Sequence, residues 1–199
     1  MARPLIALDC DGVLLDFHLG YAAAWKRAFG RTPLERDPHA YWPIDRWKVE
    51  RLGTADRMKF RAAFDEHFWA TMLPIEGAVG ACHRLESAGF DLICVSALEI
   101  EFEAARLRNL HDLGFPIERV IATGNAEGPR SPKAEAIEEL QPIAFVDDYA
   151  PYLRGLPERV HTALVLRAPN GSPNTGADLA LAKSVHDDLR GFADHWLAR

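Results

Sequence analysis

The chain has 199 residues, of which 48% are hydrophobic and 26% are charged, and its formal net charge is −6. This composition suits one folded domain of ordinary size, or one domain that carries a modest insertion, and the negative charge argues against binding to a nucleic acid polymer. Three scattered cysteines favour a reducing compartment over a disulfide framework. We find no signal-peptide pattern and no apolar run near the ~18 residues of a membrane span, so we expect a cytoplasmic protein that does not bind membranes. The sequence does not indicate an oligomeric state.

The first predicted element is a buried strand within LIALDCDGVLLDF, residues 5–17. Its apolar part leads directly into two acidic residues, Asp9 and Asp11, which Gly12 follows. If the strand continues through Asp11, both carboxylates lie on one face, because alternate residues of a strand share a face. Two acids in that arrangement repel each other unless a positive group lies between them.

Residues 16–74 differ from the rest of the chain and hold 11 of its 19 aromatic residues. In this segment Thr54 is a candidate N-cap for a helix with Phe60, Phe64, Phe68 and Met72 at i+4 spacing, ended by Pro74. We therefore expect a small α-helical cap, inserted after the first strand, with these rings in a core of its own.

Strands and helices alternate from residue 75 onwards. We expect strands at residues 92–96, 119–122, 143–146 and 161–166, and helices at 78–88, 99–113, from 131 onwards and around 189–196. Residues 168–176 read as a mobile loop. Short apolar strands separated by amphipathic helices predict an α/β fold with a Rossmann-like parallel sheet, covered by helices on both faces. The predicted domains are a core of residues 1–15 and 75–199 and a cap of residues 16–74.

Polar residues gather where these strands end. Asp9 and Asp11 follow the first strand, Ser96 ends the second, Asp147 and Asp148 end a later one, and Lys133 opens a helix. Ligands of open parallel sheets bind at the carboxyl ends of the strands, so we expect these side chains to meet. Four converging carboxylates need a cation, and an all-oxygen ligand set favours Mg²⁺. With the lysine and the hydroxyl, such a site would suit a phosphoryl group.

This set of residues resembles the haloacid dehalogenase superfamily of phosphohydrolases. LDCDGVLLDF resembles its first motif, the Ser96 that ends LICVS its second, Lys133 in SPKAEAI its third, and FVDD its fourth. The resemblance implies that Asp9 is the nucleophile and a metal ligand, and that Asp11 is the general acid/base and binds metal through its backbone carbonyl. It also implies that Ser96, Lys133 and Gly12 hold the phosphate, and that Asp147 and Asp148 complete the Mg²⁺ site.

Within the superfamily, the chain looks most similar to the small-cap 5′(3′)-deoxyribonucleotidase-like group. Phe17, the aromatic cap and the tail FADHW carry this resemblance, whereas Val95 and Ala97 depart from the group's usual residues beside Ser96. The expected substrate is a small phosphorylated metabolite, with a nucleoside monophosphate as one candidate. Phe17, His18, Trp42 and Trp47 are candidate substrate contacts.

Other functions stay open at this point. The chain could be a non-catalytic relative that binds a phosphorylated ligand, or a hydrolase of sugar phosphates or phosphonates. Phosphonate hydrolysis in this superfamily uses a cap lysine, for which Lys26, Lys48 and Lys59 are candidates. A kinase is disfavoured because the sequence has no Gly-rich loop of the G-x-x-x-x-G-K type. Dehalogenation is disfavoured because the superfamily's dehalogenases generally lack the second acid, here Asp11.

Overall fold

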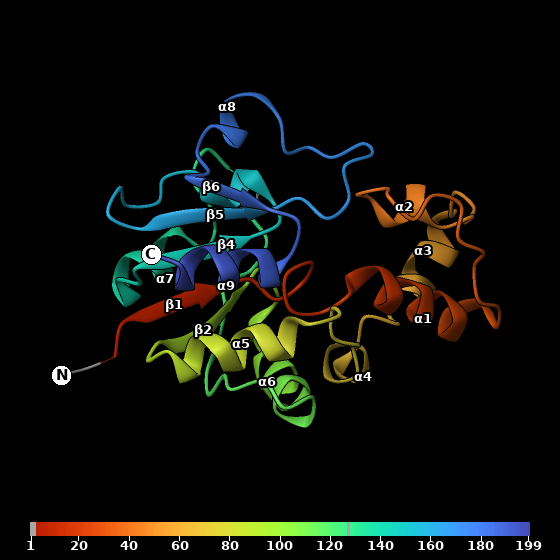
Figure 1. The fold of residues 1–199 in the computed structure, drawn as a ribbon. Coiled ribbons are helices and arrows are strands. Elements are labelled where there is room, and N and C mark those ends of the chain that lie inside the picture. The colour runs from red at the N-terminus through yellow and green to blue at the C-terminus, as the bar shows by residue number, and fades with distance from the viewer. Residues whose placement is uncertain (1–2, 127) are drawn as a thin grey trace.

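The computed structural model describes residues 3–126 and 128–199, and in these the chain forms a six-stranded sheet of order β3-β2-β1-β4-β5-β6 (Figure 1). All neighbouring strands run parallel. The strands are β1 (Leu5–Leu8), β2 (Asp91–Ser96), β3 (Val120–Ala122), β4 (Ala144–Asp147), β5 (His161–Val165) and β6 (Ser184–His186). The predicted α/β fold class is confirmed.

The helices that the structure describes fall into two groups. Four follow β1 along the chain and make up the insertion: α1 (Phe17–Phe29), α2 (Pro43–Arg46), α3 (Thr54–Arg61) and α4 (Glu66–Ala70). The others are α5 (Ala78–Ser87), α6 (Glu103–Asp112), α7 (Ala134–Leu140), α8 (Gly176–Leu179) and α9 (Leu189–Leu197), with 3₁₀ turns η1 (Ile100–Phe102) and η2 (Ala150–Leu153).

The central strands are buried on both faces, which explains their continuous apolar sequences. In β1, Ile6 and Leu8 belong to one core cluster with residues of α5, α6 and α9, whereas Ala7 belongs to another with residues of α7 and η2. The same alternation continues in the neighbouring strands, because side chains of period two point to opposite faces. Helices on both faces of the sheet follow from this pattern.

Helices α1–α4 form an insertion to one side of the sheet (Figure 1). The two chain segments that connect it run together: the Asp16 N–H donates to the Leu73 carbonyl, and the Ile75 N–H donates to the Leu14 carbonyl. This double connection joins residues 14–16 to residues 73–75. The insertion is thus joined to the core a few residues after Asp9 and Asp11, which follow β1.

One helix predicted in the insertion is wrong in extent. The segment from Thr54 to Met72 forms two helices, α3 and α4, with a break near Asp65. Asp65 causes the second start, because its carboxylate accepts the Phe68 N–H as an N-cap. Thr54 is the first helical residue rather than the cap. The rings of Phe60, Phe64 and Phe68 still meet, with centroids 5.1 and 4.5 Å apart, and form the small aromatic core that was predicted.

The remaining differences concern short elements. The helix predicted at 99–113 starts as η1 and becomes α-helical only at Glu103. The helix predicted from Ser131 begins at Ala134, and the Ser131 hydroxyl accepts the Lys133 N–H at 3.1 Å instead. Strand β6 was not predicted, because three residues at a partly exposed sheet edge carry no apolar run.

Candidate active site

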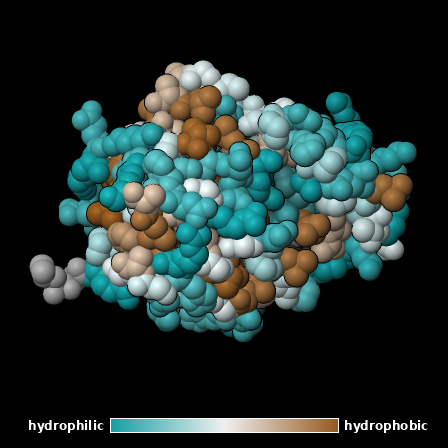
Figure 2. Space-filling model, viewed as in Figure 1, coloured by the Kyte–Doolittle hydropathy of each residue, from teal (hydrophilic) through white to brown (hydrophobic). Residues whose placement is uncertain are grey.

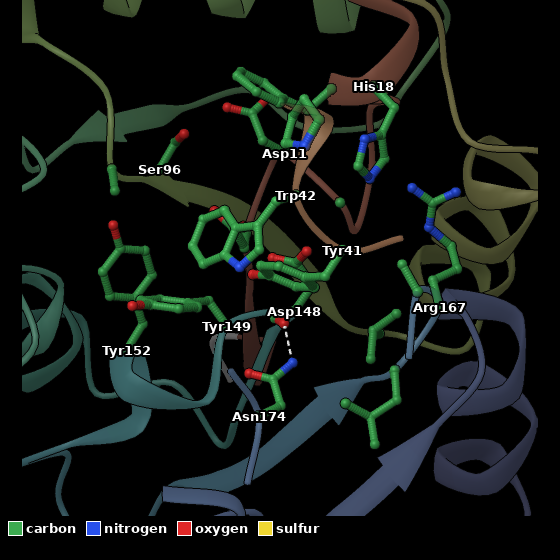
Figure 3. A pocket seen from close by; sticks show the side chains of 18 of the residues that line it. Asp11, His18, Tyr41, Trp42, Ser96, Asp148, Tyr149, Tyr152, Arg167 and Asn174 are labelled. Carbon is green, nitrogen blue, oxygen red and sulfur yellow. Dashed lines mark hydrogen bonds between the residues drawn. The ribbon is translucent and has the colours of Figure 1, made fainter. Parts of the chain in front are cut away.

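A cavity of about 440 Å³ lies at the carboxyl ends of the strands, where the insertion faces the sheet (Figure 3). Acidic and hydroxyl side chains of the core line it, namely Asp9, Asp11, Ser96 and Asp148. Six aromatic side chains from the core and the insertion line it as well: Phe17, Tyr41, Trp42, Trp69, Tyr149 and Tyr152. The convergence predicted at this sheet edge therefore includes residues at or just beyond the ends of three adjacent strands, β2, β1 and β4.

Three carboxylates form a cluster at this edge. Asp9, Asp147 and Asp148 each contribute an oxygen, and these oxygens lie within 4.8 Å of one another. Asp9 and Asp147 are buried, at 5% and 0% exposure. Burial and the neighbouring Asp9 and Asp147 raise the pKa of Asp148 well above its usual value. The cluster therefore concentrates negative charge in a place with little water to screen it.

Lys133 is the cation inside this cluster. Its Nζ lies 2.5 Å from Asp9 Oδ1 and 2.7 Å from Asp147 Oδ2, and its side chain is fully buried. Burial alone would lower the Lys133 pKa, but Asp147 and Asp9 raise it, so the ammonium form is stabilised. The other oxygen of Asp147 accepts the Tyr149 N–H at 2.9 Å. Both oxygens of Asp147 thus have partners within the protein.

Asp11 departs from the predicted convergence of four carboxylates. Strand β1 ends at Leu8, and the side chain of Asp11 pairs with Arg106 of α6 rather than joining the cluster. Arg106 Nη2 lies 2.8 Å from Asp11 Oδ1 and 3.1 Å from Oδ2. Burial raises the Asp11 pKa, while Arg106 acts against that rise. The two acids of the first motif are therefore separated, each with its own buried cation.

Gly12 makes the close approach of Asp148 possible. Its φ is +90°, and a Cβ at this position would lie 2.1 Å from Asp148 Oδ2. Any larger residue would displace that carboxylate from the cluster.

Asn174 supports the same turn, because its side chain donates to the Asp148 carbonyl and accepts the Ala150 N–H, both at 2.7 Å. Figure 3 shows Asn174 directly beside Asp148. Asn174 was not predicted, since it lies in a segment that the sequence marks only as a loop.

The predicted substrate contacts divide into two groups. Phe17, His18 and Trp42 line the cavity, and Trp42 is 43% exposed. Trp47 does not line it; its side chain is buried, and its Nε1 donates to the His18 carbonyl at 3.0 Å. Trp47 therefore supports the backbone behind His18 rather than contacting the cavity.

His18 and Arg167 form one end of the cavity (Figure 3). Burial lowers the pKa of His18 to about 4, with help from Arg46 and Arg167, so the imidazole is neutral at pH 7. His18 Nδ1 and Arg167 Nε are buried and have no hydrogen-bond partner among the described residues. Arg167 was not predicted, because its strand end, β5, carries no acidic or hydroxyl motif. This end can accept a polar group of a ligand.

The insertion also reaches the core through Asn170. Its N–H donates to the His39 carbonyl at 3.0 Å, its carbonyl accepts the Tyr41 N–H at 2.9 Å, and its side chain donates to Asp37. Burial raises the pKa of Tyr41, and so do Asp148, Asp147 and Asp9. A residue of the insertion is thus held next to the acidic cluster. The predicted loop 168–176 is a loop, but Asn170 and Asn174 fasten it.

The lysines of the insertion lie elsewhere. Lys26, Lys48 and Lys59 are exposed, and none of them lines the cavity described here. Lys59 Nζ lies 5.5 Å from the centroid of the Phe29 ring. The arrangement thus gives no support to a cap lysine acting on a phosphonate.

Solved structures with the same architecture cover nearly the whole chain. A HAD family hydrolase from Deinococcus radiodurans R1 with bound phosphate and sodium aligns over 98% of this chain and 96% of its own, with a TM-score of 0.65 and 15% identity. A dehalogenase with an intermediate complex aligns over 99% of this chain and 97% of its own, with a TM-score of 0.62 and 16% identity. CbbY from Rhodobacter sphaeroides in complex with phosphate aligns over 94% of this chain and 95% of its own, with a TM-score of 0.57 and 15% identity. The chain has the haloacid dehalogenase (HAD) superfamily fold.

This likeness concerns the HAD fold, since phosphate-binding proteins and dehalogenases share it at similar low identity. Neither a protein-family model nor a curated protein sequence matches the chain. No helix in the described part of the chain is long and apolar enough to cross a membrane. The reaction must therefore be argued from the residues in the cavity.

A divalent metal fits the donor set of this HAD-fold site. Asp9, Asp147 and Asp148 offer only oxygen atoms, which hard cations such as Mg²⁺ prefer. Lys133 supplies one positive charge against three carboxylates, which leaves the cluster short of cations. A divalent ion beside Asp9 and Asp148 would complete the neutralisation.

Proposed function

We propose that this protein is a metal-dependent phosphomonoesterase that hydrolyses a small phosphorylated metabolite. The observation that carries the proposal is the separation of Asp9 and Asp11. Asp9 lies in the acidic cluster beside Lys133, while Asp11 lines the same cavity but pairs with Arg106. Two carboxyl groups with such different surroundings suit two different tasks.

Asp9 is the proposed nucleophile. One of its oxygens is held by Lys133, and the other can attack phosphorus, which forms an aspartyl phosphate and breaks the bond to the leaving oxygen. Asp11 gives a proton to that oxygen, so the product leaves as an alcohol. Asp11 then takes a proton from water as the water attacks the aspartyl phosphate. Inorganic phosphate leaves, and both carboxyl groups return to their initial state.

Ser96 and Lys133 are the proposed partners of the phosphoryl oxygens. Lys133 is fully buried and is not among the residues that line the cavity. Two of its three N–H donors contact Asp9 and Asp147, and the third is the one proposed for a phosphoryl oxygen. Ser96 ends β2 and lines the cavity. Gly12 lines the cavity as well. Donors fixed in place before the reaction stabilise charge without having to reorient.

Asp9 and Asp148, with the backbone carbonyl of Asp11, are the proposed ligands of Mg²⁺. Asp147 is the less suited direct ligand, because Lys133 and the Tyr149 N–H use its oxygens. Its proposed task is to hold Lys133 in place. A bound Mg²⁺ would neutralise the phosphoryl oxygens and the carboxylates together.

A carbon–halogen bond is a less suitable target for this site. Halide ions leave without a proton, so a dehalogenase needs neither Asp11 nor a metal. An alkoxide is a poor leaving group, and its departure from a phosphate ester is helped both by a proton from Asp11 and by a metal ion.

The size and lining of the cavity favour a substrate larger than phosphate itself. Six aromatic side chains line the same cavity as Asp9 and Asp148, and His18 and Arg167 line it as well. A ring can stack on such walls. Nucleoside monophosphates are the first candidates, followed by sugar phosphates.

Phosphate release from a substrate panel tests the proposal. The panel contains nucleoside monophosphates, sugar phosphates and an aryl phosphate, and each is assayed with Mg²⁺ and with EDTA. We expect metal-dependent release that Asp9→Asn abolishes, because an amide cannot form the aspartyl phosphate. The exposed Asp56 of α3 supplies the control variant, Asp56→Asn, which should retain wild-type rates.

Three results would contradict the proposal. Halide release from 2-haloacids with no phosphate release would favour a dehalogenase. Silence across the whole panel, with Mg²⁺ still bound, would favour a non-catalytic protein that binds a phosphorylated ligand. Appreciable activity of Asp9→Asn would place the nucleophile at another residue.

A further inference from the structure

Arg106 is a fully buried cation that connects Asp11 to the insertion. Its Nη2 contacts both oxygens of Asp11, and its Nη1 lies 3.1 Å from Met72 Sδ. Its guanidinium carbon lies 4.9 Å from the centroid of the Trp69 ring. An arginine without water costs free energy unless it is paired, so this position demands a specific partner. Asp11 supplies the carboxylate that pairs with Arg106.

The contact with Arg106 leaves part of Asp11 open to the cavity. The side chain of Asp11 is 25% exposed, whereas that of Arg106 is 0% exposed. A carboxylate has about four lone-pair sites, and one nitrogen of Arg106 uses two of them. Arg106 thus holds the carboxylate from its buried side. The remaining sites can face a substrate in the cavity that Asp11 lines.

The guanidinium itself is fixed by residues next to the insertion's second connection. Trp69 belongs to α4, and Met72 lies two residues beyond the end of that helix. Asn109, one turn after Arg106 on α6, donates to the Met72 carbonyl at 3.1 Å and holds that segment to the same helix. The position of the insertion and the position of Asp11 are thereby linked through one side chain.

We propose that Arg106 is the positioning residue of the general acid/base, and that it sets where the Asp11 carboxylate meets the leaving oxygen. This inference rests on the proposed function. Without Arg106, the short Asp11 side chain can rotate to another staggered rotamer and leave its place in the cavity. A displacement of about 1 Å at a reacting group can cost ~10²-fold in rate.

Two esters with similar rings but different leaving groups test this role. 4-Nitrophenolate leaves 4-nitrophenyl phosphate without a proton, whereas the alkoxide of benzyl phosphate needs one. We compare kcat/KM, which reports on the steps up to breakage of the ester bond. In Arg106→Met we expect a loss of ~10²-fold for benzyl phosphate and only a few-fold loss for 4-nitrophenyl phosphate. Asp11→Asn should give the same pattern, and the double variant should lose little more.

The ratio of the two rates is insensitive to partial misfolding, because inactive protein lowers both rates equally. Arg106→Lys keeps the buried charge and should recover part of the loss. Arg108 offers a matched control on the same helix, since it pairs with Glu66 of α4 and has no contact with Asp11. Arg108→Met should keep the wild-type ratio.

With both esters turned over by the wild type, as the proposed function requires, an equal loss for both esters in Arg106→Met would overturn the role of Arg106. An unchanged rate for both would overturn it as well. Failure of the wild type to release phosphate from either ester would instead count against the proposed function, on which this role depends.

Discussion

Gly12 is required by its neighbour across the site as much as by its own backbone. Its φ of +90° already favours glycine, and the carboxylate of Asp148 occupies the space of a Cβ. We expect Gly12→Ala to displace Asp148 and to reduce both Mg²⁺ affinity and phosphate release by at least ~10-fold. Titration with Mg²⁺ and steady-state assays measure the two effects.

Gly30 is the matched control for this substitution. Its φ is +75°, and nothing lies within 4 Å of a Cβ added there. Gly30→Ala therefore introduces the same kind of backbone strain, worth roughly 1 kcal/mol, without a clash. It should lower the melting temperature slightly and leave kcat/KM unchanged. Wild-type Mg²⁺ affinity in Gly12→Ala would show that the close approach of Asp148 is dispensable.

Which residues could be found from the sequence depends on how local their signal is. Asp9, Asp147 and Lys133 stand at strand or helix ends, so their convergence follows from the parallel sheet alone. Arg106 carries no such signal, because an arginine on a helix is usually solvent-exposed. Its one sequence clue is that it shares a helix face with Leu110, four residues later, which is buried. Only the packing of α6 brings it to Asp11.

The insertion contains tryptophans with two different tasks. Trp42 is 43% exposed and lines the cavity, so Trp42→Ala should raise KM for a ring-bearing substrate by roughly 3–10-fold and leave stability near the wild-type value. Trp47 is buried and donates to the His18 carbonyl. Trp47→Ala should lower the free energy of unfolding by about 3–5 kcal/mol, because it leaves a cavity.

Denaturant unfolding and steady-state kinetics of both variants separate these tasks. The reverse pattern, with a stable Trp47→Ala and an unstable Trp42→Ala, would mean that the insertion packs differently in solution. An unchanged KM in Trp42→Ala for every substrate would remove stacking on this ring from the proposed function.

Helices and strands of the core were predictable because burial on both faces gives them continuous apolar runs. The helices of the insertion were less predictable. The i+4 spacing of Phe60, Phe64 and Phe68 suggested one helix, but Asp65 is the N-cap of a second helix that starts between Phe64 and Phe68. The rings still pack together, since an aromatic core needs the rings to meet and does not need a continuous helix. A spacing pattern therefore located the core of the insertion better than it located its helices.

The acidic cluster couples the stability of the whole molecule to metal binding. Asp9, Asp147 and Asp148 are held together with one buried lysine, so like charges repel when no cation neutralises them. A metal that binds only the folded state stabilises it by about 2.7 kcal/mol at a concentration of 100 times Kd. For a chain of this length, Mg²⁺ should then raise the melting temperature by roughly 5–10 °C.

Asp148→Asn should change this response in two ways. Without metal, in EDTA, its melting temperature should be equal to or above that of the wild type, because one charge of the crowded cluster is gone and burial no longer opposes it. With Mg²⁺, the rise should be largely lost. Asp11→Asn is the control: it lies outside the cluster and leaves Arg106 without its partner, so it should melt earlier yet keep the Mg²⁺-dependent rise. A full rise in Asp148→Asn would assign the metal to Asp9 and Asp147 instead, and Asp147 would then have to release Lys133 or the Tyr149 N–H.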